Sequence, residues 1–200
     1  MADDRFENLK KIPPGPAARL LADANLKLDT ELDAPVSAPA SEVLKELEEK
    51  GALVDMLKLI SAALPPRECV WWACLAAHDV PAKETSPILK AAEKWVFQPT
   101  KENREALQAV IQLAGPDDDQ ALCGTAAFYG DGTLGTGDLE TEPAPVGVVA
   151  AMSLGQNFLC LKDRDDDQEH MRVLIDRGLD IARGGNGRLD GAPGEGVAEG

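Results

Sequence analysis

The side chains that could support acid–base or nucleophilic catalysis are few in this 200-residue chain, and their spacing forms no familiar catalytic set. General acid–base catalysis uses histidine or paired carboxylates that converge in one pocket. The two histidines are His78, near the end of an apolar stretch, and His170, within a charged one. The spacing indicates no Ser-His-Asp or Cys-His arrangement either. We therefore expect a protein that is not an enzyme.

Four cysteines, Cys69, Cys74, Cys123 and Cys160, lie among apolar neighbours and form no CxxC pair. Unreactive cysteine packs like a small hydrophobic residue, so we expect buried free thiols in a reducing compartment. A zinc site would need Cys74 and His78, at the i, i+4 spacing of a helix, together with Cys123 or Cys160. Structural zinc sites usually show paired ligand spacings, which are missing here. The sequence predicts no metal and no cofactor.

One glycine-rich stretch, GDGTLGTGDLETE at residues 130–142, matches a known ligand-binding motif in its letters alone. GDGTLG fits the dinucleotide pattern GxGxxG, but that motif needs a strand before it, whereas a helix is expected here. The carboxylates lack the alternating spacing of a calcium loop. We expect a surface loop, with partner binding through Tyr129, Asp131 and Leu134 as the alternative. An enzyme site between this loop and the apolar segment 66–78 is a further alternative.

Arg67 and Glu68 are charged residues at the start of that apolar segment. They either pair with neighbouring helices at the edge of the core or border a groove that receives a partner. We therefore take both as candidate partner-binding residues. The acidic triplets at 117–119 and 165–167 precede predicted helices, whose N-termini attract negative charge, so no metal is needed to explain them.

Helices must position these residues, because the hydrophobic content of 44% is mostly Ala, Leu and Val, with few β-branched runs. Apolar residues recur at helical spacing between proline and glycine stops. Helix caps are expected at Ser41, Ser86 and Thr100. The pattern predicts an all-α fold, a compact stack or bundle of about seven to eight antiparallel helices.

Composition also divides the chain into three parts. Residues 1–40 are rich in Pro, Ala and Asp and are predicted to be a flexible segment with one short helix at 15–24. Residues 41–183 form the helical domain. Residues 184–200, GGNGRLDGAPGEGVAEG, have little apolar surface to bury and are predicted to be a disordered tail.

Two adjacent tryptophans mark the segment 66–78, which is apolar on nearly every side. A helix that is apolar all round is covered by neighbours on several sides, so this one is predicted to be central. Consecutive helical side chains point about 100° apart, so Trp71 and Trp72 must reach into different interfaces. We expect Trp71, Trp72 and Trp95 to belong to the structural core.

The formal net charge of −15 argues against nucleic acid as a partner, because an acidic surface repels a phosphate backbone. The first residues, MADDRFENLKK, lack the apolar core of a signal peptide. No apolar run approaches the roughly 18 residues that cross a bilayer. We expect a soluble, cytoplasmic protein with no membrane insertion.

Two segments carry a family resemblance: LPPRECVWWACLAA at 64–77 and LKAAEKWVFQPTKENREAL at 89–107. They resemble the block Leu-Pro-x-Arg-Glu-x-x-Trp-Trp-Ala-Cys, followed by Ala-Ala-Glu-x-Trp-Val, of an uncharacterised bacterial family. The likeness extends over roughly residues 15–183, although Tyr129 and Asp131 depart from the family's Ser-Gly-Gly-Ser turn. Family members are associated with gene neighbourhoods of type VI secretion systems. The resemblance implies an accessory role and supplies no catalytic residues.

Three functions are therefore open. The first is a non-enzymatic helical accessory or adaptor protein of a type VI secretion system, which binds a secretion component or an effector. The second is an immunity protein, because a small acidic helical chain can neutralise a cationic toxin with the help of electrostatic steering. The third is an enzyme with its site near the loop at 130–142.

Overall fold

The computed structural model describes residues 4–81, 84–115, 118–162 and 164–189. Within these residues the fold is all-α, as predicted, with nine α-helices, two short 3-10 helices and no strand. The α-helices are α1 (Ala17–Asp23), α2 (Ala40–Glu49), α3 (Leu53–Ala63), α4 (Pro66–His78), α5 (Pro87–Phe97), α6 (Lys101–Leu113), α7 (Ala121–Phe128), α8 (Val148–Leu159) and α9 (Asp167–Arg183). The 3-10 helices are η1 (Asp4–Phe6) and η2 (Gly137–Thr141). None of these helices has the length and apolar character that a membrane span requires.

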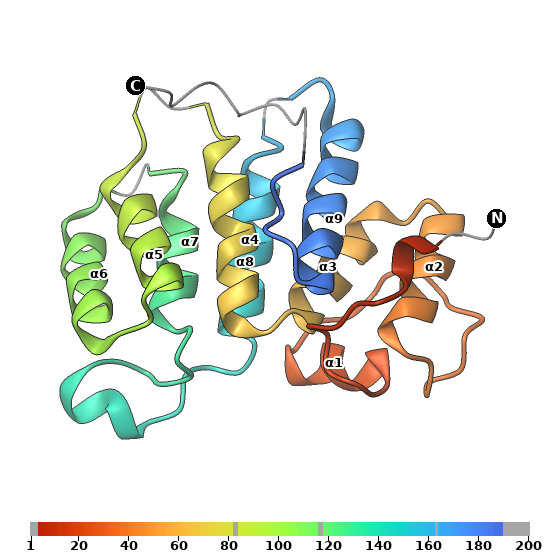
Figure 1. The fold of residues 1–200 in the computed structure, drawn as a ribbon, viewed down its shortest axis with the longest axis horizontal. Coiled ribbons are helices and arrows are strands. Elements are labelled where there is room, and N and C mark those ends of the chain that lie inside the picture. The colour runs from red at the N-terminus through yellow and green to blue at the C-terminus, as the bar shows by residue number, and fades with distance from the viewer. Residues whose placement is uncertain (1–3, 82–83, 116–117, 163, 190–200) are drawn as a thin grey trace.

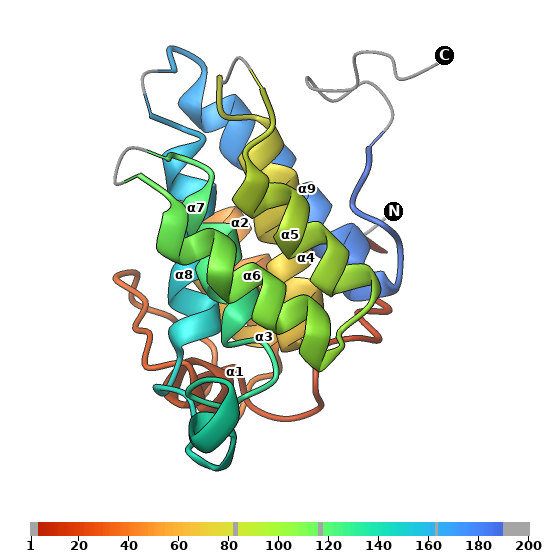
Figure 2. The same cartoon turned by 90° about the vertical axis from the view of Figure 1, so that its left-hand side faces the viewer.

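Helices α4 and α8 lie in the middle of the molecule (Figure 1). Helices α5, α6 and α7 stand on one side of this pair, and α9, α3, α2 and α1 stand on the other. From α4 onward, successive helices run alternately up and down in this view, which gives the antiparallel stack that the sequence predicts. The view from the side places α5 and α6 on the outer face (Figure 2).

Helix α4 contributes to two hydrophobic cores. Trp72 and Leu75 pack into the core formed with α2, α3 and α9. Val70 and Cys74 pack into the other core, formed with α5, α6 and α7. Because apolar side chains leave α4 in several directions, the helix contacts α5, α7, α8 and α9. The predicted central position of the segment 66–78 is confirmed.

Local capping explains where several helices begin and end. The Ser86 hydroxyl accepts a hydrogen bond from the N–H of Leu89, and the Thr100 hydroxyl accepts one from the N–H of Asn103, so both predicted caps are confirmed. The prediction for Ser41 is wrong, because α2 already begins at Ala40 after Pro39. Gly51, in a left-handed conformation with φ of 67°, follows the end of α2 as predicted.

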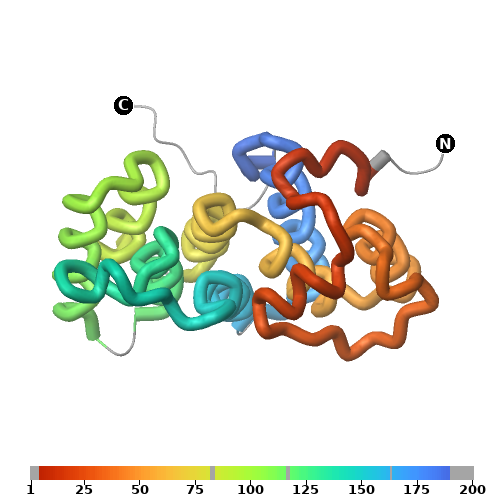
Figure 3. The backbone as a smooth tube through the Cα atoms, turned by 90° about the horizontal axis from the view of Figure 1, so that it is seen from below, coloured from red at the N-terminus to blue at the C-terminus, as the bar shows by residue number. Residues whose placement is uncertain are grey.

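The described part of the N-terminal segment contains η1, the predicted short helix α1 and otherwise irregular backbone. Seen from below, it lies along the half of the molecule that contains α2 and α3 (Figure 3). The buried carboxylate of Asp55 on α3 accepts hydrogen bonds from the N–H groups of Asp29 and Thr30, at 2.9 and 2.7 Å. Burial alone would raise the pKa of Asp55, but hydrogen bonds from Lys58 and Thr30 hold this pKa below its usual range. The segment is therefore fastened to α3.

Helix α9 ends at Arg183 and is followed by Gly184, which has a left-handed φ of 103°. Residues 184–189 belong to the predicted tail and are described; the rest of that tail, 190–200, lies outside the described residues. The N–H of Gly187 donates to the Asp180 carboxylate at 2.8 Å. The chain after α9 therefore turns back along the helix, beside α4.

Candidate functional site

The adjacent tryptophans of α4 lie in different surroundings. Trp72 is fully buried, and its ring N–H donates to the carbonyl oxygen of Leu174 on α9 at 2.9 Å. Trp95 on α5 is also buried. Trp71 is only partly buried, and its ring N–H donates to the Asn186 carbonyl at 2.7 Å. Trp71 packs against both hydrophobic cores but is less buried than Trp72 and Trp95, because the irregular chain after α9 covers only part of its ring.

A cavity of about 500 Å³ opens beside Trp71. Its walls come from four distant parts of the chain: the N-terminal segment, the first turns of α4, the end of α5 and the segment that follows α9. The lining residues are Lys11, Arg67, Glu68, Trp71, Val96, Phe97, Ile181, Gly184, Gly185, Asn186 and Arg188. The volume lies within the range of roughly 300–1,000 Å³ that is typical of ligand-binding clefts.

Aromatic side chains form the apolar part of this cavity. The rings of Trp71 and Phe97 meet edge to face, with centroids 5.4 Å apart. Phe97 is the last residue of α5 and is 64% exposed. The guanidinium of Arg188 lies over the Trp71 ring, 5.7 Å from its centroid. Such a solvent-exposed aromatic pair beside arginine matches the composition of energetically important residues in protein interfaces.

Two predicted partner-binding residues lie at this cavity. Pro65 and Pro66 begin α4, which places Arg67 and Glu68 in its first turn. The Arg67 Nε donates to the Val96 carbonyl on α5 at 2.5 Å. Glu68 forms an ion pair with Lys11, at 2.7 Å. Both charged side chains therefore join α4 to other segments and also border the cavity.

The other three predicted residues lie elsewhere. The N–H of Leu134 donates to the Glu142 carbonyl at 2.8 Å, which closes the loop on itself. Tyr129 packs edge to face on Phe128 and lines a separate cavity of about 370 Å³ near the start of α8. Asp131 lines a third cavity, of about 280 Å³. The predicted set is thus divided between the α4 cavity and the loop region.

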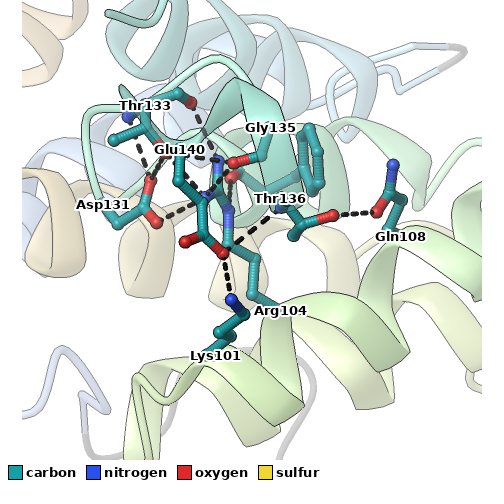
Figure 4. A network of polar contacts seen from close by, with 10 residues as sticks. Lys101, Arg104, Gln108, Asp131, Thr133, Gly135, Thr136 and Glu140 are labelled. Atoms are coloured by element: carbon teal, nitrogen blue, oxygen red, sulfur yellow. Dashed lines mark hydrogen bonds and ion pairs between the residues drawn. The ribbon is translucent and has the colours of Figure 1, made fainter. Parts of the chain in front are cut away.

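Arg104 on α6, which sequence analysis does not single out, holds this loop in place (Figure 4). Its side chain is 3% exposed and donates to the carbonyls of Phe128, Thr133 and Gly135, at 2.7 to 2.8 Å. It also forms an ion pair with Asp131 at 2.6 Å. An arginine three residues before Leu107, on the apolar stripe of α6, is the sequence signal for this role.

The charged groups that line the cavity beside the loop are paired with one another. Lys101 and Glu140 form an ion pair at 2.6 Å, which raises the pKa of Lys101 and lowers that of Glu140. Thr136 donates to the side-chain oxygen of Gln108 at 2.8 Å. The cavity beside the loop therefore has polar walls whose cations and carboxylates neutralise one another. Its geometry supports attachment of the loop to α6 rather than acid–base chemistry.

A second buried polar cluster joins the ends of α4, α8 and α9. The Asp79 carboxylate lies 2.9 Å from His170 Nε2 and forms an ion pair with Arg177. Ligand atoms of Asp79, Cys160 and His170 all lie within 4.8 Å of one another, a grouping that could hold a metal ion. Burial, followed by the charge of Asp79, raises the pKa of Cys160 to about 12. Because Arg177 already supplies a cation to Asp79, the cluster suits a structural ion pair better than a metal.

The other metal grouping considered from the sequence does not form a ligand set among the described residues. His78 Nε2 lies 2.8 Å from the Glu93 carboxylate on α5. Cys74 does lie against Cys123, one of the ligands considered with it, and burial, followed by that contact, raises the pKa of Cys74, but His78 does not complete a group of three ligand atoms with them. All four cysteines are free and buried, as predicted.

Residues 43–182 match the model of a family of unknown function, DUF6931. The matched range includes Arg67, Trp71 and Phe97, whereas Lys11 and Arg188 lie outside it. No curated protein and no solved structure matches the chain.

Proposed function

This chain belongs to DUF6931, a family of unknown function, and we propose that it is a non-enzymatic helical accessory or adaptor protein. It acts by binding a segment of a partner protein in the cavity beside Trp71. The observation that carries this proposal is the partly exposed Trp71–Phe97 pair at the wall of a cavity of about 500 Å³. Burial of such aromatic surface supplies much of the free energy in many protein interfaces.

The construction of the cavity supports a binding role. Trp71 and Phe97 sit on two adjacent helices, and the hydrogen bond from Arg67 to the Val96 carbonyl joins these helices at the cavity. Rigid helices that present aromatic side chains lose little conformational entropy when a partner binds. The site is therefore organised before binding.

The proposed setting is the cytoplasm of a bacterium with a type VI secretion system. Support for this setting comes from the resemblance of the segments 64–77 and 89–107 to a family found in such gene neighbourhoods. The partner would be a secretion component or an effector.

The test is capture of partners from the native host with tagged full-length protein. Trp71→Ala and Phe97→Ser should lose the partner, because each removes one wall of the cavity. The matched control is Leu113→Ser on α6, which changes a side chain that is 87% exposed and lies outside this cavity. Equal recovery of the partner by the Trp71 variant and the wild type would contradict the proposed site. A partner unrelated to secretion would contradict the proposed setting.

The charge of the chain favours a second candidate, an immunity protein. With 35 acidic and 20 basic residues, the protein would attract a cationic toxin over a long range. Co-expression with the product of a neighbouring toxic gene separates the two functions. Restored growth, together with toxin binding in vitro that weakens at high ionic strength, would favour immunity. If the toxin still kills the cells, this candidate is removed.

A further inference from the structure

The charges at the Trp71 cavity oppose the charge of the whole molecule. The chain has a net charge of −15, yet the cavity brings together Lys11, Arg67 and Arg188 with a single carboxylate, Glu68. Glu68 is already paired with Lys11, at 2.7 Å. The remaining cations, Arg67 and Arg188, determine which charge a bound group must carry.

Neither arginine has a carboxylate within 4.0 Å among the described residues. The Arg67 Nε is engaged by the Val96 carbonyl, which fixes the plane of the guanidinium. The donors on its two Nη atoms have no acceptor in the described part of the chain. A planar guanidinium with free donors is suited to a carboxylate, which it can bind through two parallel hydrogen bonds.

An apolar surface lies next to these donors. Phe97 is exposed at the rim, and Arg188 covers part of the Trp71 ring. A cationic occupant would meet two arginines that have no carboxylate partner among the described residues, and the Trp71 face that could receive it is already occupied by Arg188. A carboxylate with an apolar side chain beside it would complement both halves of the cavity.

We propose that the occupant is an acidic linear segment of a partner protein, which places a carboxylate on Arg67 and an adjacent apolar side chain against Trp71 and Phe97. This inference rests on the proposed function and adds the chemistry of the partner. Because the net charge of the chain repels an acidic protein at a distance, the rest of the partner must be neutral or basic. The acidic segment is then recognised by contact inside the cavity.

The test is selection of random linear peptides on the full-length protein. Selected peptides should carry Asp or Glu within a few positions of Leu, Phe or Trp. The dissociation constant of the best peptide should rise at least about tenfold in Arg67→Gln, because hydrogen bonds to a charged group are lost. The control is Arg172→Gln, which removes the same charge from an exposed position on α9 outside the cavity and should leave binding unchanged.

The outcomes separate the two proposals. Peptides that need Trp71 but bind Arg67→Gln as tightly as the wild type would overturn the acidic segment and leave the binding site standing. Selected peptides without an acidic residue would do the same. If no selected peptide loses affinity in Trp71→Ala, both proposals fail.

Two other occupants are tested in the same assay. A synthetic peptide with the sequence of residues 190–200, which carries two glutamates and an aspartate, is used as a competitor. If it binds as tightly as the selected peptides, the occupant is the protein's own C-terminal segment and the partner proposal is overturned. Self-association of the wild-type protein that disappears in Arg67→Gln would show that a second copy of this chain occupies the cavity, and the partner proposal would be overturned as well.

Discussion

At the scale of single residues, the two tryptophans of α4 have different roles: Trp72 stabilises the core, and Trp71 lies at the surface where a partner can contact it. Trp72 fills the core and donates a hydrogen bond to α9, whereas Trp71 reaches the surface between Phe97 and the chain after α9. Helical geometry predicts that the two rings diverge. It does not predict which ring is exposed, because that depends on how Asn186 and Arg188 fold back over α4.

The two tryptophans should therefore differ in their effect on stability. Trp72→Ala should lower the free energy of unfolding by about 3–5 kcal/mol, because it leaves a large cavity in the core. Trp71→Ala should lower it by only about 1 kcal/mol, which is usual for a partly exposed position. Urea denaturation followed by circular dichroism measures both values. Equal losses would contradict the division.

At the scale of elements, sequence patterns predict most of the helices but fewer of the contacts between them. Proline and glycine stops predict the ends of α3, α4 and α5 to within a residue or two. The start of α2 is misplaced, and just before it the N–H of Ala17, from a distant part of the sequence, donates to the Ala38 carbonyl at 2.8 Å. No local pattern records such a contact.

The candidate site shows the same limit. Arg67 and Glu68 are found from their position before an apolar helix, but Lys11, Phe97 and Arg188 are not, because only folding brings them to the cavity. The loop at 130–142 is recognised from its glycines. Its attachment through Arg104 is missed, because the prediction for α6 considers the apolar residues of its buried face and not the arginine that lies among them.

Loss of Arg104 should release this loop. Arg104→Leu replaces the guanidinium with an apolar side chain and so removes the donors to the Phe128 and Gly135 carbonyls. We expect the free energy of unfolding to fall by roughly 2–4 kcal/mol, with faster amide hydrogen exchange throughout the loop. The exposed Lys101–Glu140 pair gives the comparison, since Lys101→Gln should raise exchange in the loop far less than Arg104→Leu does. Slow exchange in the Arg104 variant would show that other contacts hold the loop.

At the scale of the whole molecule, buried thiols link stability to alkaline pH. Burial raises the pKa of Cys69 to about 12, and burial together with Asp79 raises that of Cys160 to about 12, against an ordinary value of 9.0. Below that ordinary value, both the folded and the unfolded chain keep these protons. Above it, only the unfolded chain releases them, so unfolding becomes more favourable as pH rises.

The size of this effect can be measured thiol by thiol. Each buried thiol should lower the free energy of unfolding by about 1.4 kcal/mol per pH unit between its unfolded and folded pKa values. Urea denaturation at several values from about pH 8 to pH 10 gives the slope of the unfolding free energy against pH. Cys69→Ala should make this slope shallower by the contribution of one thiol. Lysine titration affects both proteins alike and cancels in the comparison. Parallel slopes would mean that Cys69 already ionises in the folded protein.

The walls of the Trp71 cavity come from residue 11, residues 67–71, residues 96–97 and residues 181–188. The N–H of Lys11 also donates to the Ala182 carbonyl, at 2.8 Å, so segments about 170 residues apart in the sequence meet at this place. During synthesis on the ribosome, the cavity therefore cannot close until residue 188 has emerged. Contacts between such distant segments form late in folding, because a long loop must be ordered first. A partner that recognises this cavity would distinguish a chain that has folded as far as residue 188 from a nascent or truncated chain that stops before it.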